Sequence, residues 1–313
     1  MSGRSKTLIS AAVMAAIFGF LGYLIARDWQ KLSEIDWWQS PEMLGLHLVL
    51  LASVFLLFVK SWQIAVIGMG SACTLGQAGH TWLLPNLGKY LPGKVLMFAG
   101  RVELCHRQGM SRGTAIATVI LEHVVIILAA TPFLVIALFS DLTAFDSGYL
   151  TGFGLLLLCG GVAIVLRPAG LRWLLERMAK VLRRDLSVVP ADGLALRLLP
   201  LYLLLWLVYG LSGYVLIHAL GFGSTVPALL ATTAFVAAWE VGFLSFLTPG
   251  GLGVREATLV GLLSPYLSVS EATTVALLAR VSWTLVEMLG AGIGVWNGGG
   301  PIASRAEKTS GSE

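Results

Sequence analysis

The stretch LTPGGLGVREATLVG, residues 247–261, places a proline, three closely spaced glycines and two charged side chains inside an otherwise apolar part of the chain. Proline lacks a backbone N–H and ends or kinks a helix, so Pro249 is expected to stop the incoming helix. Glycine adopts conformations closed to other residues and lets a ligand approach the backbone closely. The glycines concerned are Gly250, Gly251 and Gly253. The stretch is therefore predicted to be a glycine-hinged break between helices, with a plain turn between two spans as the alternative.

The composition around this break is that of an integral membrane protein. The 313 residues are 57% hydrophobic and 12% charged, whereas about a quarter of the residues in a soluble domain are charged. Several apolar stretches reach the roughly 20 residues that a helix needs to cross the hydrocarbon core of a bilayer. The sequence has no run of short alternating strands, which is the pattern of a membrane barrel. We therefore expect an all-α, polytopic integral membrane protein.

Apolar runs bounded by glycine, proline and charged residues predict about six full spans. They lie at residues 8–26, 43–69, 113–139, 148–166, 195–221 and 270–297. Two further segments, 72–107 and 225–266, are apolar enough to be embedded, but each contains a Pro-Gly pair and several charges. Irregular backbone is tolerated at membrane depth only where protein or a watery cavity satisfies the freed polar groups. Both segments are therefore predicted to be broken or re-entrant helical elements.

The basic residues gather at expected membrane borders. The formal net charge is +4, and the densest basic run, residues 167–185, has leucines on one helical face and arginines opposite, which predicts an interfacial helix. Cytoplasmic loops are enriched in Lys and Arg, so the N-terminal, central and C-terminal segments are placed in the cytoplasm, at the inner (cytoplasmic) membrane of a cell. Nucleic-acid binding is not expected. A secretory signal is the alternative for the first apolar stretch, but no convincing cleavage site follows it.

Two halves with similar breaks are predicted. The first transmembrane half is 1–166, a cytoplasmic basic amphipathic linker is 167–194, the second transmembrane half is 195–297, and a disordered tail is 298–313. Residues 91–124 can be laid on residues 248–281 with one small gap, so that Pro92 and Gly93 match Pro249 and Gly250. The topology brings the first broken element in from the cytoplasm and the second from outside. The halves are therefore predicted to be pseudo-symmetric and inverted, an architecture in which transporters bind substrate near the midplane.

Ionisable side chains concentrate around the two breaks. Each costs at least about 2.5 to 3.5 kcal/mol at the bilayer centre unless it is paired or hydrated. Lys94 and Arg255 each follow a Pro-Gly pair, where a restarted helix directs unsatisfied N–H groups and the positive end of its dipole toward the same point. That arrangement suits an anion. Lys94 and Arg255, together with Arg280 in the last span, are therefore predicted to attract the phosphate of a membrane lipid.

Acidic side chains accompany these cations. The candidates are Glu122, Glu240 and Glu256, which are predicted to contact a cationic headgroup or to balance the positive charges. The alternative for any of these intramembrane charges is a buried ion pair that holds helices in register, such as Glu122 with a nearby arginine or Arg280 with Glu256. Arg101 and Arg107 are interpreted as charges at the cytoplasmic border.

Motifs for nucleotide binding or metal binding are not found in the sequence. The patterns GxxxxGK[ST] and HExxH are absent, the five histidines are dispersed, and the three cysteines form no CxxC pair. These patterns are the ones that report a phosphate loop, a zinc hydrolase and a thiol-based site. No cofactor, metal or enzymatic activity is expected.

The motifs GKYLPGKV, residues 88–95, and PGGLGVREA, residues 249–257, followed by LLARVSWTLVEMLGAGIG, residues 277–294, resemble the transmembrane region of lysylphosphatidylglycerol synthases. The resemblance covers about residues 8–297. Its first motif matches Gly88, Lys89, Pro92, Gly93 and Lys94, and its second matches Pro249, Gly250, Gly251, Gly253, Arg255 and Glu256. Arg280 matches an arginine usual in the last span. Glu122 matches a glutamate commonly followed by arginine, whereas this chain has His123 there.

The resemblance implies lipid transport. In the multiple peptide resistance factors, this region moves aminoacylated phosphatidylglycerol between leaflets and is joined to a cytoplasmic synthase domain, which this sequence does not show. We therefore expect a flippase for an anionic or aminoacylated phospholipid or a polyprenyl-phosphate-linked lipid. The alternatives are an integral-membrane transferase acting on a lipid-linked substrate and a non-transporting partner of a lipid-modifying enzyme.

Overall fold

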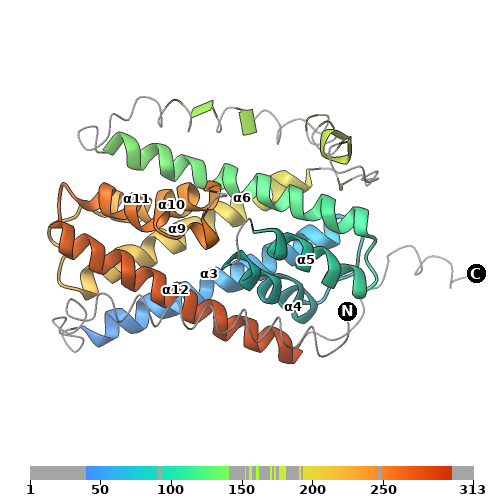
Figure 1. Ribbon diagram of the computed structural model, residues 1–313, viewed down its shortest axis with the longest axis horizontal. Coiled ribbons are helices and arrows are strands. Elements are labelled where there is room, and N and C mark those ends of the chain that lie inside the picture. Colours follow the sequence, from blue (N-terminus) through green and yellow to red (C-terminus); the bar gives the residue numbers. More distant parts are fainter. Residues whose placement is uncertain are drawn as a thin grey trace, which may run out of the picture.

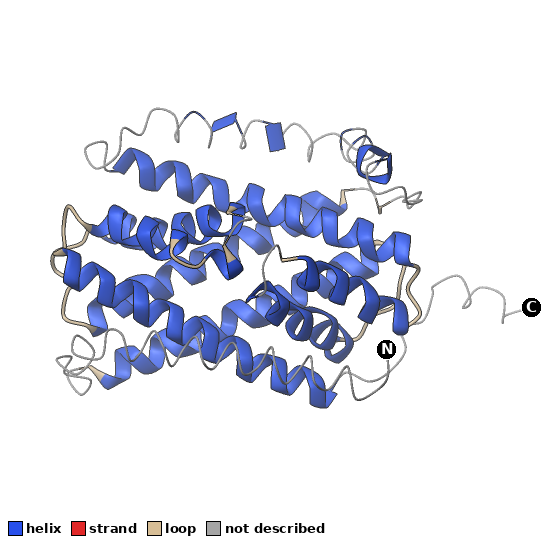
Figure 2. Ribbon diagram, in the orientation of Figure 1, coloured by secondary structure: helices blue, strands red, loops and turns tan. Residues whose placement is uncertain are grey.

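The computed structural model describes residues 40–90, 94–140, 190–191, 193–245 and 248–297, together with scattered positions between 152 and 180. Every element in these parts of the chain is helical (Figure 2). The expected first span, the hinge residues Pro92 and Gly93, and the tail lie outside the described residues. The expected span at 148–166 and the interfacial helix of the central loop lie mainly outside them.

Four long apolar helices form the frame of the protein. They are α3 (Pro41–Gly68), α6 (Arg112–Ser140), α9 (Leu194–Ala219) and α12 (Val269–Asn297). Each is long and apolar enough to cross a membrane, since a helix rises about 1.5 Å per residue and the hydrocarbon core is about 30 Å thick. Their positions agree within a few residues with four of the spans expected from the sequence.

Helices α3 and α9 run antiparallel to each other. The Ala191 N–H, just before α9, donates to the Gly68 carbonyl at the end of α3 over 3.0 Å. Near the start of α3, His47 Nδ1 lies 2.9 Å from the Ser212 carbonyl, far along α9. The segment that follows α3 and the segment that follows α9 therefore begin at opposite ends of the molecule (Figure 1).

The segment after α3 forms a first helical hairpin. Helix α4 (Leu75–Asn86) runs inward, the short 3₁₀ helix η1 (Leu87–Tyr90) forms its tip, and α5 (Val95–Arg107) returns to the end where α6 begins. Thr74 and Gln77 cap α4 reciprocally: the Gln77 N–H donates to Thr74 Oγ1, and the Thr74 N–H donates to Gln77 Oε1. This capping box fixes where the inward helix starts.

The segment after α9 forms a second helical hairpin from the other end. Helix α10 (Ala228–Leu244) runs inward, the 3₁₀ helix η2 (Pro249–Gly251) forms the tip, and α11 (Val254–Leu263) returns to the end where α12 begins. The expectation that Pro249 stops the incoming helix is wrong, because α10 already ends at Leu244 and Pro249 begins η2. The two breaks expected in residues 72–107 and 225–266 are both present.

The tips of the two hairpins meet in the middle of the molecule. A Cβ atom placed on Gly250 in η2 would lie 3.3 Å from the ring of Tyr90 in η1. Each hairpin also lies along a long helix from the other half of the sequence, since α4 packs on α12 and α10 packs on α6. The interior between the tips is therefore enclosed by helices from both halves of the chain.

Gly251 shows why the second tip needs glycine. Its φ is +74°, and an added Cβ would lie 2.6 Å from the carbonyl oxygen of Gly242. A side chain at this position would meet rigid backbone and would also adopt a left-handed conformation that L-residues avoid. The glycine therefore allows η2 to pack directly on the end of α10.

Candidate functional site

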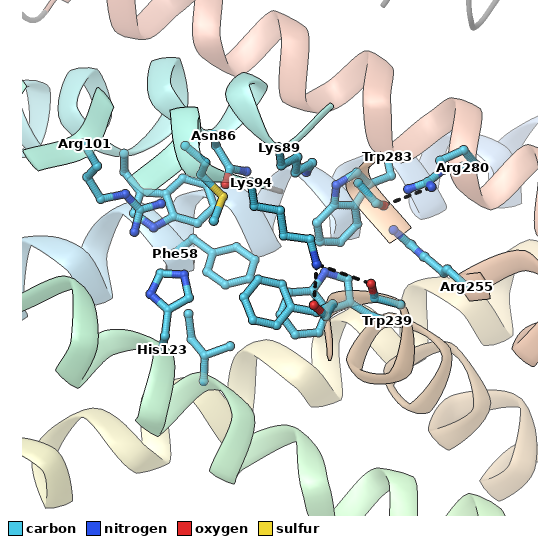
Figure 3. A pocket seen from close by; sticks show the side chains of 16 residues that line it. Phe58, Asn86, Lys89, Lys94, Arg101, His123, Trp239, Arg255, Arg280 and Trp283 are labelled. Carbon is cyan, nitrogen blue, oxygen red and sulfur yellow. Dashed lines mark hydrogen bonds between the residues drawn. The ribbon is translucent and has the colours of Figure 1, made fainter. Parts of the chain in front are cut away.

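A small cavity lies between the two hairpin tips, and five cationic side chains line it (Figure 3). They are Lys89, Lys94, Arg101, Arg255 and Arg280. The cavity offers about 50 Å³ to the centres of water-sized molecules. One water needs about 10 to 15 Å³ on this measure, so the space is large enough for a few waters or a small anionic group. The three cations predicted to attract a phosphate, Lys94, Arg255 and Arg280, are all in its wall.

Lys89 is held by a buried carboxylate of the last long helix. Its Nζ lies 2.6 Å from Glu287 Oε1. The Asn86 side-chain amide donates to the same oxygen over 2.5 Å, and the Tyr90 hydroxyl donates to Glu287 Oε2 over 2.8 Å. The charge of Lys89 is therefore balanced, and this network fastens the tip of the first hairpin to α12.

Arg101 forms a second balanced pair. Its guanidinium binds the carboxylate of Glu122 on α6 and lies 5.0 Å from the ring of Trp62 and 5.1 Å from that of Trp82. The Trp82 indole N–H donates to the same carboxylate over 2.7 Å. The interpretation of Arg101 as a border charge is wrong, because its side chain is only 2% exposed. Arg107 lies on the surface and pairs with Glu103.

Arg280 holds the tip of the second hairpin. Its Nε lies 2.8 Å from Glu256 Oε1, and its Nη2 donates to the Gly250 carbonyl over 3.1 Å. The other oxygen of Glu256 accepts a hydrogen bond from the Gly253 N–H over 2.8 Å. The ion pair between Arg280 and Glu256 that the sequence offered as an alternative is therefore present, and it fixes the backbone of η2.

Lys94 joins the two hairpins to each other. It precedes α5 directly, with a left-handed φ of +55°, the one positive φ of a non-glycine residue in the described chain. Its ammonium donates to the carbonyls of Phe243 and of Ser245, the latter over 3.2 Å, and lies 4.6 Å from the Phe243 ring. Figure 3 shows the side chain extended toward the end of α10. The last carbonyls of a helix carry partial negative charge and attract cations.

The partners of Arg255 in the described chain are neutral groups. It lies in the first turn of α11, donates to the Tyr209 hydroxyl and lies 5.0 Å from the Trp283 ring. Its side chain is buried, and among the described residues no carboxylate lies within ion-pair distance of it. The indole N–H of Trp283, another lining residue, has no hydrogen-bond acceptor in this part of the chain. Arg255 is thus a buried cation at the N-terminus of α11, and the Trp283 indole N–H is an unsatisfied donor in the same cavity wall. Together they favour an anionic group in the cavity.

One known family of membrane proteins matches most of the chain. The model of the family described as the lysylphosphatidylglycerol synthase TM region matches residues 7–290 of the chain. The protein belongs to this family. No curated protein sequence matches the chain.

Membership in the lysylphosphatidylglycerol synthase TM family, together with the four long apolar helices, indicates a multi-pass membrane protein with a lipid-related function. Several residues of the motifs that resemble the family line the cavity. Lys89 and Lys94 come from the first motif, Gly250 and Arg255 from the second, and Arg280 from the last span.

The predicted glutamates do not line the cavity of this family member. Glu122 and Glu256 balance Arg101 and Arg280, as the ion-pair alternative anticipated. Glu240 is fully buried on α10 and contacts Thr131 on α6 instead. Each of the three carboxylates therefore contacts a side chain of another helix and is not among the residues that line the cavity.

Aromatic residues of the cavity wall were missed by the sequence analysis. Trp239 stacks on Phe243 with ring centroids 5.0 Å apart, and Trp82 stacks on Phe58 at 4.6 Å. All four side chains and that of Trp283 line the cavity. A signal was present, since Trp82, Trp239 and Trp283 lie inside embedded segments, whereas tryptophan is usually found at membrane–water interfaces. The aromatic rings exclude water around the cations and strengthen their attraction for an anion.

Proposed function

We propose that this protein moves a lipid with a phosphate-containing headgroup between the two leaflets of the membrane. The substrate class is an anionic or aminoacylated phospholipid or a polyprenyl-phosphate-linked lipid. The observation that carries the proposal is Arg255, a buried cation without a carboxylate partner among the described residues, at a cavity lined by four further cations. A phosphate is the anion that a membrane lipid would supply there, and arginine binds phosphate oxygens in pairs.

The mechanism that we propose uses the two hairpins as halves of an inverted repeat. Helix α3, the first hairpin and α6 would form one repeat, and α9, the second hairpin and α12 the other. Their order along the chain, the antiparallel run of α3 and α9, and the meeting of the tips support this division. Transporters of this architecture bind substrate between broken helices and open it to each side in turn. The hydrocarbon tails would remain in the bilayer while the headgroup passes between the tips.

Lys94 offers a route from phosphate binding to movement. In the structure its ammonium bonds to the carbonyls at the end of α10 and so ties the first tip to the second hairpin. A phosphate in the cavity would compete with these carbonyls for the same ammonium, because charged oxygens are the stronger acceptors. Exchange of partners at Lys94 would weaken one contact between the hairpins when the headgroup is bound.

Lipid movement in reconstituted vesicles tests the proposal. The protein is placed in vesicles that contain NBD-labelled phosphatidylglycerol, lysylphosphatidylglycerol or polyprenyl phosphate, and dithionite reports the label that reaches the outer leaflet. We expect faster exposure with the wild-type protein than in empty vesicles, and loss of this increase in R255A. R107A is the matched control, because Arg107 is an exposed arginine in a surface ion pair, and it should behave as wild type.

The same vesicles separate the rival functions. Chemical analysis of the lipids after the assay reveals a transferase if a labelled lipid acquires or loses a group. Absence of both movement and chemical change for every lipid of the panel would favour a non-transporting partner. Full lipid movement by a folded R255A protein would reject the role of Arg255.

A further inference from the structure

Three glutamate side chains are completely buried in the described part of the chain, and one of them differs from the other two. Glu122 pairs with Arg101, and Glu287 pairs with Lys89. Glu240, on α10, has no cation within ion-pair distance among the described residues, and its Oε2 has no hydrogen-bond partner there. Its one polar contact within the described residues joins Oε1 to Thr131 Oγ1 on α6 over 2.8 Å.

The hydrogen bonds of Thr131 indicate the protonation state of this carboxyl. Thr131 Oγ1 also lies 2.9 Å from the Ile127 carbonyl, one turn back in α6. A threonine hydroxyl has one proton and can donate to one acceptor at a time. If Thr131 donates to the carbonyl, its contact with Glu240 is a hydrogen bond only when the carboxylic acid donates to Thr131. Both contacts are therefore satisfied at once by a protonated Glu240.

Burial favours the same state. A carboxylate in an apolar interior without a cation loses its hydration and gains no compensating charge, so such groups take up a proton instead. The surroundings of Glu240 are the packed interface of α6 and α10, where Phe235, Ala237 and Ala238 of α10 are buried. An ionised Glu240 would oppose this packing, whereas a neutral one is compatible with it.

We infer that Glu240 is a proton-binding site, neutral while α10 packs on α6, and that loss of its proton favours separation of the two helices. Release transfers the proton from the carboxyl O–H to water and leaves the electron pair on the oxygen as a carboxylate. The coupling of this site to transport rests on the proposed function, because α10 belongs to the hairpin whose movement that function requires. Proton binding at Glu240 does not depend on which lipid is moved.

The ionisable groups on the helices around α10 are directed elsewhere. The buried or half-buried ionisable groups of α6, α9 and α11 are Glu122, His123, Tyr202, Tyr209, Tyr214, His218, Arg255 and Glu256. The His218 ring lies against the Tyr214 carbonyl of its own helix. Glu122 and Glu256 bind arginines, Arg255 binds Tyr209, and Tyr202 donates to Glu122 over 3.3 Å. The His123 ring stacks on Phe243. Lys94 bonds to the carbonyls that end α10, between three and five residues beyond Glu240.

The position of Glu240 gives its proton an effect on the cavity. The neighbouring Trp239 and, one turn later, Phe243 line the cavity, and the carbonyl of Phe243 holds Lys94. A shift of α10 away from α6 would move this aromatic pair and the carbonyl cluster together. A protonated Glu240 would therefore favour the position of the second hairpin in which α10 packs on α6. Loss of the proton would favour the position in which the two helices separate.

Infrared spectroscopy tests the proton directly, without transport. A protonated carboxylic acid has a carbonyl stretch separate from that of a carboxylate, and the band shifts in deuterated water. We expect the wild-type protein in lipid vesicles to show this band at neutral pH and E240Q to lack part of it. E103Q, which changes an exposed, ion-paired carboxylate, should retain the full band. Identical bands in wild type and E240Q would overturn the inference.

Transport under an imposed pH difference tests the coupling. The probe is NBD-labelled phosphatidylglycerol, or whichever lipid of the panel the wild type moves. A pH difference should change the wild-type rate by about five-fold or more, the lower range of coupling between sites, while E240Q should move lipid at one rate with or without it. An E240Q response equal to that of wild type would overturn the coupling. Failure of the wild type to move any lipid would reject the proposed function, and the infrared band would still decide whether Glu240 carries a proton.

Discussion

The two helical hairpins reach the same point of the molecule with different chemistry. The first tip carries Lys89 and is followed by Arg101, and each of these cations is matched to a buried carboxylate on a long helix. The second tip is followed by Arg255, which donates to a hydroxyl and lies against aromatic rings. The first hairpin is thus fastened to the frame by balanced charge, whereas the second presents positive charge that nothing in the described chain neutralises.

The backbone differs between the tips as well. The second turns through glycines at positive φ, including Gly250 and Gly251. The first places Lys94 in the left-handed region, where a non-glycine residue is strained by about 1 to 2 kcal/mol. A strained residue is retained where the surrounding contacts fix it, and such sites are frequently functional. The glycines of the second hairpin therefore let its tip pack closely on other backbone. The first hairpin instead presents the amine of Lys94 at its tip.

Removal of Arg101 should give the largest change in stability. R101A would leave Glu122 as an uncompensated buried charge, and breaking a buried pair in this way costs about 3 to 5 kcal/mol. The free energy of unfolding in mixed micelles measures the loss. R107A breaks an exposed pair with Glu103 and should cost less than about 1 kcal/mol. Equal losses for the two variants would contradict the distinction between a structural and a surface arginine.

Alanine at Gly251 should give the next largest effect. The new Cβ would meet the Gly242 carbonyl at a φ of +74°, so we expect a loss of at least about 2 kcal/mol in the free energy of unfolding from strain and overpacking. Gly253 is the matched position, with a φ of +77° and nothing within 4 Å of the added atom. G253A should cost about 1 kcal/mol. A G251A protein as stable as G253A would show that the second tip is not closely packed.

Two substitutions at Lys94 separate the effect of backbone strain from the effect of the positive charge. K94A keeps the left-handed backbone and removes the amine, whereas K94G removes the amine and relieves the strain. K94G should therefore be more stable than K94A by about 1 kcal/mol, and both should lose lipid movement in the dithionite assay. Normal transport by K94G would show that the backbone turn, and not the amine, is what the first tip contributes.

Arg255 should have the smallest effect on stability. Methionine keeps much of the side-chain volume and removes a buried charge that lacks a carboxylate partner, so R255M should unfold within about 1 kcal/mol of wild type or be more stable. Thermal unfolding in detergent measures this change, and lipid movement should nevertheless be lost. A loss of stability as large as that of R101A would mean that Arg255 is a structural residue like the arginine of the first hairpin.

The apolar pattern of the sequence predicts the frame well because a helix in lipid must satisfy its own backbone. Helices α3, α6, α9 and α12 therefore begin and end close to the charge and glycine breaks that bound them. The interruptions after α3 and α9 were predicted for the same reason. The end of α10 was not, since the helix ends at Leu244, before the Pro-Gly pair that was expected to stop it. There Lys94 of the other hairpin binds the carbonyl of Phe243.

The site was predicted in part. Lys94, Arg255 and Arg280 stood out because charges are rare in apolar segments, and the structure brings them to one cavity. Their partners could not be assigned from the sequence, because pairing joins residues that are far apart in the chain, such as Lys89 with Glu287. Spacing along the chain does not distinguish a paired cation from an available one. For this reason Arg101 was misplaced at the border, and the contact of Glu240 with Thr131 was not foreseen when Glu240 was predicted to contact a headgroup or to balance the cations.

A map of the protein in nanodiscs of phosphate-containing lipid, obtained by electron cryo-microscopy, tests the central claim most directly. We predict that η1 and η2 meet from opposite sides of the bilayer and that headgroup density lies between them, within hydrogen-bond reach of Arg255. Separated tips, or headgroups confined to the two membrane surfaces while Arg255 binds a carboxylate of the chain, would contradict the account.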